Sequence, residues 1–176
     1  MDPLTIFGLQ LIFSLIVWGL IAKWVVTPWL ATQSRHQALF WLTLPHVSRH
    51  VGMVFLVPGI VMQGLPDSFA IPTAYGDLIS AVLALLALGA LRTGRTGALV
   101  LVWIFNIVGT VDLVLALSHA DAVPLIGAAW YIPTFWVPLL LVTHVMIFVR
   151  LIKKESSVKA NNVSRVAVSG SGIQGI

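Results

Sequence analysis

Residues 98–117 read ALVLVWIFNIVGTVDLVLAL, a stretch of 20 residues with one acidic side chain, Asp112, and no basic side chain. An α-helix rises about 1.5 Å per residue, so this stretch is long enough to cross about 30 Å of hydrocarbon. The connection before it, RTGRTG at 92–97, carries two arginines. A long apolar run that follows a short basic connection predicts a transmembrane helix.

Similar apolar runs occur on both sides of this stretch. Transmembrane helices are predicted at about 4–27, 40–62, 73–91, 98–117 and 127–150. Apolar residues make up 59% of the chain and charged residues 9%, whereas a soluble domain carries about 25% charged residues. The sequence therefore predicts an all-α polytopic integral membrane protein. We expect residues 1–152 to form one antiparallel bundle of five transmembrane helices, followed by a flexible cytoplasmic tail at 153–176.

The charged residues alternate between the two sides of this bundle. The connections after the first and third helices, and the tail, are basic, whereas those after the second and fourth contain Asp67 and Asp121. Short basic connections stay in the cytoplasm, so the N-terminus is predicted outside and the C-terminus inside. We expect a bacterial cytoplasmic (inner) membrane, with the lipid bilayer as partner. Because the basic residues form no dense stripe, we expect no nucleic-acid partner.

Three further features of the composition bear on the bundle. The chain contains no cysteine, which excludes disulfides, thiolate metal sites and iron–sulfur ligation. Gly76, Ser80 and Ala84 recur every four positions in the third helix, a pattern that predicts close packing of a neighbouring helix. Pro133 and Pro138 in the fifth helix predict a kink or an altered helix end.

The densest group of polar residues lies in the second predicted helix, in the stretch PHVSRH at 45–50. On an α-helix, His46 would lie within about 60° of both Arg49 and His50, so that the three side chains share one face. His144 in the fifth helix is expected at a similar depth, in the inner half of the membrane. We therefore predict that these four residues bind a small or lipid-like anionic ligand, because arginine flanked by histidines suits an anionic group.

Other functions fit the same residues. One of His46 or His50, together with His144, could ligate haem b in a redox subunit. The chain could also be a proton- or ion-coupled transport component, or a non-catalytic accessory subunit, in a homo-oligomer or a larger membrane complex. In a plainer interpretation, the second helix begins near Thr43 and Arg49 reaches the lipid headgroups. Arg49 would then be only one of the basic residues that mark the cytoplasmic side. The sequence does not decide whether the protein is an enzyme.

Three polar residues lie inside other predicted helices, namely Asn106, Asp112 and Asp77. Asp112 is expected to pair with Arg49 or His50 if the second helix runs deep, or to form packing hydrogen bonds as Asn106 does. Asp77 is expected in the first turns of the third helix, near the interface, where the helix dipole favours an acid. Both carboxylates are predicted at least roughly 10 Å from the histidines in depth, so we predict no metal site.

Overall fold

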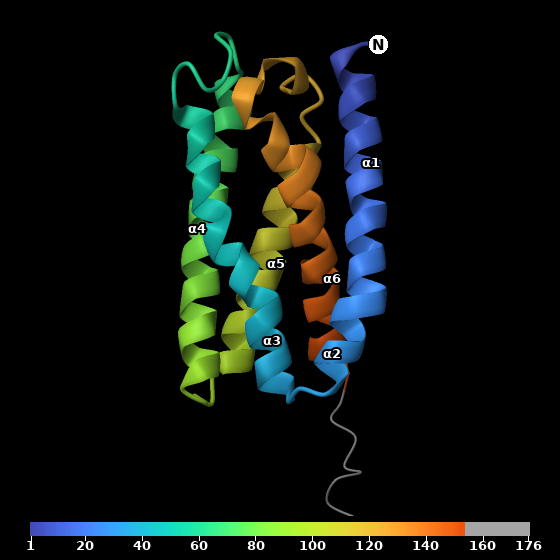
Figure 1. Ribbon diagram of the computed structural model, residues 1–176. Helices are drawn as coiled ribbons and strands as arrows, with labels where there is room; N and C mark the ends of the chain where they lie inside the picture. The colour runs from blue at the N-terminus through green and yellow to red at the C-terminus, as the bar shows by residue number, and fades with distance from the viewer. Residues whose placement is uncertain (154–176) are drawn as a thin grey trace, which may run out of the picture.

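The computed structural model describes residues 1–153, and the predicted tail at 153–176 lies outside the described residues except for Lys153 (Figure 1). The elements are α1 (Pro3–Ile21), η1 (Ala22–Val26), α2 (Thr27–Ala31), α3 (Arg35–Thr43), η2 (Leu44–Leu56), α4 (Asp67–Arg92), α5 (Ala98–Leu117), η3 (Val123–Leu125), η4 (Gly127–Trp130), η5 (Ile132–Trp136) and α6 (Val137–Ile152). Of these, η2, η3 and η4 are 3₁₀-helices, and η1 and η5 are π-helical. The part of the chain that the structure describes contains no strand, so the all-α prediction is confirmed.

Four helices of the described chain are long and apolar enough to cross a membrane, as judged by length and composition. They are Pro3–Ala31, Asp67–Arg92, Ala98–Leu117 and Gly127–Ile152. They correspond to the first, third, fourth and fifth predicted helices. The third begins at Asp67 and not at 73, because Asp67 suits the positive end of the helix dipole and Pro72 is accommodated inside the helix. Asp67 is therefore a helical residue and not a loop residue.

The second predicted helix has an unusual conformation. It runs as an α-helix over Arg35–Thr43 and continues as a 3₁₀-helix of 13 residues over Leu44–Leu56. The change occurs at Pro45, whose nitrogen has no hydrogen to donate to the carbonyl one turn earlier. Runs of 3₁₀-helix longer than about four residues are uncommon and often mark a functional segment. Together α3 and η2 form one continuous rod beside α4 (Figure 1).

The bundle has a packed side and a peripheral helix. η2, α4 and α5 pack closely, and Ser80 and Ala84 of the predicted small-residue stripe are completely buried between helices. In contrast, α1 lies at the edge, alongside α6, and buries Phe7 alone among its side chains (Figure 1). Most of the surface of α1 is therefore an exposed apolar face, which is the expected condition of a helix that contacts lipid.

Both π-helical segments lie next to a proline. η1 is followed by Pro28 and η5 by Pro138, and each proline lacks the N–H that would bond to the carbonyl four residues earlier. That carbonyl lies within the π-helical segment in both cases, so the wider turn accommodates the missing hydrogen bond. The altered helical geometry predicted around Pro133 and Pro138 is present.

We call the end of the bundle that holds Met1 the N-terminal end, and the other the opposite end.

Candidate functional site

A buried arginine joins three elements near the centre of the bundle. Arg49 on η2 is 2% exposed and is the largest of the fully buried side chains. Its Nε donates to Asp77 Oδ1 on α4 at 2.7 Å, and its Nη1 donates to the Gly109 carbonyl on α5 at 2.9 Å. Its Nη2 donates to Asp112 Oδ2, also on α5. We call Arg49, Asp77 and Asp112 the ion cluster.

The ion cluster carries one uncompensated negative charge in its fully ionised form. One guanidinium faces two carboxylates, and no other cationic side chain of residues 1–153 pairs with either of them. Removing such charges from water costs several kcal/mol per ion, and direct pairing offsets only part of that cost. A group with net charge in a buried position is typical of a functional site and needs a counter-charge at some stage.

Two predictions about these acids have different outcomes. The pairing of Asp112 with Arg49, expected if the second helix runs deep, is confirmed. The expectation that Asp77 lies near the interface is wrong, because α4 begins at Asp67 and Asp77 follows about three turns later. Asp77 is 6% exposed. The long side chain of Arg49 extends from the histidine region of η2 to both carboxylates.

His46 and His144 form a second buried group next to the ion cluster. Their ring centroids are 4.1 Å apart, and the two residues are 0% and 1% exposed. His46 Nε2 lies 3.0 Å from Thr143 Oγ1, and His144 Nδ1 lies 2.7 Å from Asn106 Oδ1. His46 and His144 lie at the same level of the bundle, as expected, and their direct contact is a finding of the structure. Asn106 forms a packing hydrogen bond as expected. We call His46 and His144 the histidine pair.

The hydrogen-bond network assigns the tautomer of each neutral ring. The Thr143 hydroxyl donates to backbone carbonyls of its own helix, so its oxygen accepts the proton of His46 Nε2. The Asn106 amide donates to the His144 carbonyl, so its oxygen accepts from His144 Nδ1. His46 Nδ1 and His144 Nε2 are left as bare acceptors, and neither has a hydrogen-bond partner within residues 1–153. Each ring therefore presents one nitrogen lone pair to the interior of the bundle.

His50 does not join this group. It is exposed, and its Nδ1 contacts the Val47 carbonyl at 2.9 Å. The shared face predicted for His46, Arg49 and His50 assumed an α-helix, whereas a 3₁₀-helix turns 120° per residue and aligns every third residue. The buried residues of η2 follow that spacing, being His46, Arg49, Gly52 and Phe55.

The histidine pair does not fit bis-histidine haem ligation in this arrangement. An iron ligated by two imidazoles requires the porphyrin plane between them, but these rings contact each other directly. In residues 1–153, no group of three or more histidine, aspartate or glutamate side chains is arranged to hold a metal ion. The chemistry available to this group is therefore ion pairing, hydrogen bonding and proton exchange.

Three glycines provide the space that the buried side chains occupy. A Cβ at Gly52 would collide with the Asp77 carboxylate, and one at Gly76 would collide with that of Asp112. A Cβ at Gly109 would lie 2.8 Å from Arg49 Nη1 and 3.0 Å from His144 Nε2. The three glycines lie on η2, α4 and α5, the same elements that carry the ion cluster. The backbone of each element is therefore shaped to admit a charged side chain from a neighbour.

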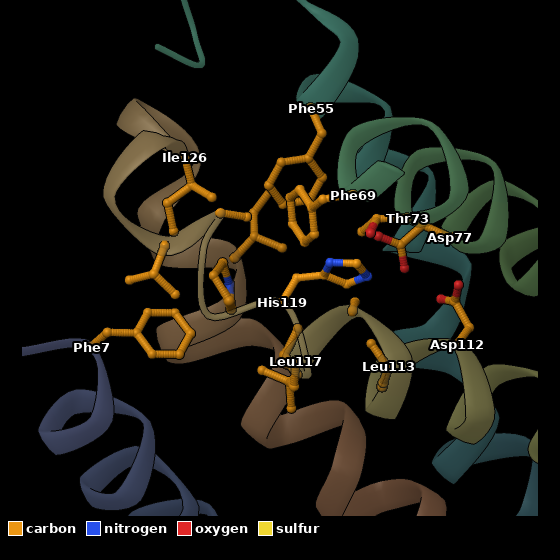
Figure 2. Close-up of a pocket in the computed structure, with 16 residues that line it drawn as sticks. Phe7, Phe55, Phe69, Thr73, Asp77, Asp112, Leu113, Leu117, His119 and Ile126 are labelled. Atoms are coloured by element: carbon orange, nitrogen blue, oxygen red, sulfur yellow. The ribbon is translucent and has the colours of Figure 1, made fainter. Parts of the chain in front are cut away.

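A small cavity reaches the ion cluster from the N-terminal end of the bundle (Figure 2). Its volume is about 40 Å³, enough for a small number of water molecules. Figure 2 shows His119 extending into this cavity toward Thr73 and Asp77, with Asp112 beyond them. His119 lies in the connection after α5, and its role in lining a cavity was not predicted. No periodic signal marks it in the sequence, because His119 lies beyond the end of α5 at Leu117.

A second, larger space reaches the cluster from the side of the bundle. This side groove has a volume of about 420 Å³. It is lined by Ser48, Arg49, Val51, Gly52, Asp77, Tyr131, Ile132, Phe135, Trp136, Val137 and Leu140. The polar groups lie at its floor, and most of its wall is apolar. A pocket of this size and composition is typical of small-molecule sites.

Toward the opposite end, the polar groups give way to a packed apolar core. Phe105 contacts both rings of the histidine pair, with centroid distances of 4.9 Å to His46 and 5.4 Å to His144. Beyond it, Leu42, Val102 and Ile147 are at most 2% exposed. The ion cluster is thus approached by a cavity from the N-terminal end and is covered by close-packed side chains on the other side.

The fold and the site define a helical-bundle protein with a buried, net-charged ion cluster between its helices. The chain belongs to the family described as "Domain of unknown function (DUF8737)", which matches residues 6–152. That region contains the whole ion cluster and the histidine pair. No curated protein and no solved structure matches the chain significantly.

Proposed function

We propose that this protein is a five-span integral membrane protein whose ion cluster binds and releases a proton, as a component of proton- or ion-coupled transport. The observation that carries this proposal is the uncompensated negative charge of Arg49, Asp77 and Asp112 among apolar helices. Ionisable groups inside membrane bundles are expensive, and they typically mark proton relays or ion pathways. A single bound proton makes the cluster electrically neutral.

The fifth span of this proposal is the rod formed by α3 and η2. At about 1.5 Å per α-helical residue and 2.0 Å per 3₁₀ residue, its 9 and 13 residues reach about 40 Å. The 26 residues of α4 reach about 39 Å by the same reasoning. The rod therefore has the length of its neighbour. With five spans, the charge pattern favours an outside N-terminus, a cytoplasmic C-terminus and a location in a bacterial cytoplasmic membrane.

The route for the proton follows the cavity at the N-terminal end. Water near His119 would reach Asp112, whose side chain is 16% exposed, while Arg49 is closed to solvent. The apolar core around Phe105 prevents an open pore, as a coupled transporter requires.

The other functions predicted from the sequence stay predictions. An anionic ligand is less favoured by this geometry, because Arg49 already donates to two carboxylates and the cluster as a whole is negative. A non-catalytic accessory role is compatible with the fold, but it gives no reason for a buried cluster with net charge. The transport proposal uses that charge directly.

Infrared spectroscopy of the purified protein in lipid tests proton binding. We expect the carboxylic-acid C=O band to grow as pH falls, with a component that disappears in Asp112→Asn. Asparagine keeps the shape of the side chain and an oxygen that can accept from Arg49. Asp121→Asn, at an exposed position, is the matched control and should retain this component. If Asp112→Asn and the parent protein titrate identically in this band, the proposal is wrong.

A further inference from the structure

We propose that the side groove binds a lipophilic ammonium ion, which competes with the proton for the ion cluster. The inference rests on the proposed function and names the class of its substrate: an apolar body with a single cationic N–H head. It follows from the walls of the groove, from the free carboxylate oxygen at its floor, and from the sign of the cluster charge.

The walls of the groove suit an apolar body. Val51 and Gly52 of η2 face Phe135, Val137 and Leu140 across the groove. The Ser48 hydroxyl and the Trp136 indole of the wall are already engaged, since Ser48 Oγ donates to the Pro45 carbonyl at 2.6 Å and accepts from Trp136 Nε1 at 3.1 Å. A ligand body in this groove would therefore meet hydrocarbon and aromatic surface along most of its length. Its volume of about 420 Å³ fits a small aryl-alkyl molecule.

The floor of the groove offers an acceptor and no free cation. Asp77 Oδ1 accepts from Arg49 Nε, whereas Asp77 Oδ2 has no hydrogen-bond donor within residues 1–153. Arg49 also lines the floor, but its three nitrogens already donate to Asp77, Gly109 and Asp112. An incoming N–H group can therefore be satisfied here, and charge-assisted hydrogen bonds to carboxylates are the stronger kind.

The charge of the cluster selects the sign of the ligand. An ammonium ion neutralises the one uncompensated carboxylate, whereas an anion would add a second uncompensated charge in a buried site. A proton neutralises the same charge. Proton and ammonium ion therefore exclude each other: when the ammonium enters the groove, the proton leaves through the cavity that ends at His119. No covalent bond other than that to the exchanged proton changes.

The two ligands use different entrances to one ion cluster. Asp77 lines both the cavity at the N-terminal end and the side groove. The groove is bordered by exposed side chains, with Tyr131 73% exposed and Phe135 and Val51 each 50% exposed. In the proposed orientation these residues contact the bilayer, so a lipophilic amine reaches the groove from the hydrocarbon. The proton arrives from the aqueous side.

The absence of cysteine from the chain allows a direct test. In Val51→Cys, a thiol is placed on the wall of the groove, and its reaction with a membrane-permeant maleimide is followed in nanodiscs. Three probes share one body: 4-phenylbutylamine, 4-phenylbutanol and 4-phenylbutyrate. We expect the amine to slow labelling at a concentration at least about tenfold lower than the alcohol or the carboxylate requires, because a charge-assisted hydrogen bond strengthens its binding. Ile79→Cys, exposed on α4 outside the groove, is the control and should label equally with all three.

A second measurement links the amine to the carboxylate. Adding 4-phenylbutylamine to the parent protein in weak buffer should release up to about one proton per bound amine, and Asp77→Asn should release none. Equal protection of Val51→Cys by the alcohol and the amine overturns the inference, whether or not Asp77→Asn folds. If the infrared titration succeeds but the amine gives no protection, the amine inference alone fails. If the amine protects but no carboxyl titrates and no proton is released, proton coupling fails.

Discussion

At the scale of single residues, Arg49 accounts for the arrangement of the site. It has three acceptors in three directions, on Asp77, Asp112 and the Gly109 carbonyl. A guanidinium can donate along all three directions from one rigid plane, whereas a lysine ammonium is a compact point charge. Arg49 therefore holds η2, α4 and α5 together while it compensates one of the two carboxylates.

Removal of this side chain should be strongly destabilising. Arg49→Ala leaves two carboxylates buried near each other without a cation, and we expect a loss of about 3–5 kcal/mol in the free energy of unfolding. Unfolding in mixed micelles measures this loss. Combining Arg49→Met with Asp77→Asn and Asp112→Asn removes all three charges and should restore most of the stability. If Arg49→Ala unfolds like the parent protein, the cluster does not stabilise the bundle.

The close approach at Gly109 gives a second residue-level prediction. Gly109→Ala places a methyl group 2.8 Å from Arg49 Nη1 and from the His144 ring, so we expect destabilisation by about 1–3 kcal/mol. The same mixed-micelle unfolding experiment applies. Gly89→Ala is the matched control, because nothing lies within 4 Å of its Cβ position. Equal stabilities of the two variants would contradict the packing described for α5.

The sequence predicted part of this site. Arg49 was one of two expected partners of Asp112, and His46 and His144 were expected at a similar depth, but the contact between the two histidines was not predicted. The sequence placed Asp77 too close to the start of its helix. That helix begins at Asp67, and Pro72, a residue type usually found near a helix start, lies inside it. The side groove could not be predicted, since it depends on how η5 packs against η2 and not on any local pattern.

At the scale of elements, the 3₁₀ conformation of η2 decides which side chains reach the site. A 3₁₀-helix places His46, Arg49 and Phe55 on one line and turns His50 away. An α-helix would group His50 with His46 and put Phe55 on the opposite face. Amino-acid composition alone could not distinguish a 3₁₀-helix from an α-helix in this segment, because both conformations bury an apolar and glycine-containing face.

Cysteine labelling separates these conformations. Thiols at His50→Cys and Phe55→Cys, each introduced alone, are reacted with a membrane-permeant maleimide under native conditions. We expect His50→Cys to react readily and Phe55→Cys to react slowly, since Phe55 is 3% exposed and His50 is exposed. Leu56→Cys, one residue further along and partly buried, serves as an intermediate reference. The reverse order of reactivity would indicate an α-helix.

At the scale of the whole molecule, the number of crossings determines the sides of the four connections. The all-α bundle and four of its long helices were predictable because long apolar runs have few alternatives. That residues 35–56 cross the membrane is a proposal, because the 3₁₀ part of this segment and its polar residues make its sequence less typical of a transmembrane helix.

Single cysteines in the connections test that crossing. In right-side-out vesicles, a membrane-impermeant maleimide should label Gln63→Cys and Ser118→Cys directly. Thr32→Cys and Thr93→Cys should be labelled only after permeabilisation. All four positions are exposed, so differences report the side of the membrane and not burial. Labelling of Gln63→Cys and Thr32→Cys from the same side would exclude a crossing between them.

The 3₁₀ conformation of η2 also makes this segment longer than an α-helix of the same residues would be. Its 13 residues reach about 26 Å as a 3₁₀-helix but about 20 Å if rewound as an α-helix. Rewinding would shorten the rod by about one helical turn and rotate Arg49 away from its carboxylates. The ion pairs thus hold η2 in its longer 3₁₀ conformation, and a thinner bilayer favours the shorter α-helical conformation. Distances between spin labels at Leu44→Cys and Val57→Cys, compared in short-chain and long-chain lipids, should shorten in the thinner membrane; an unchanged distance would mean that the rod is rigid.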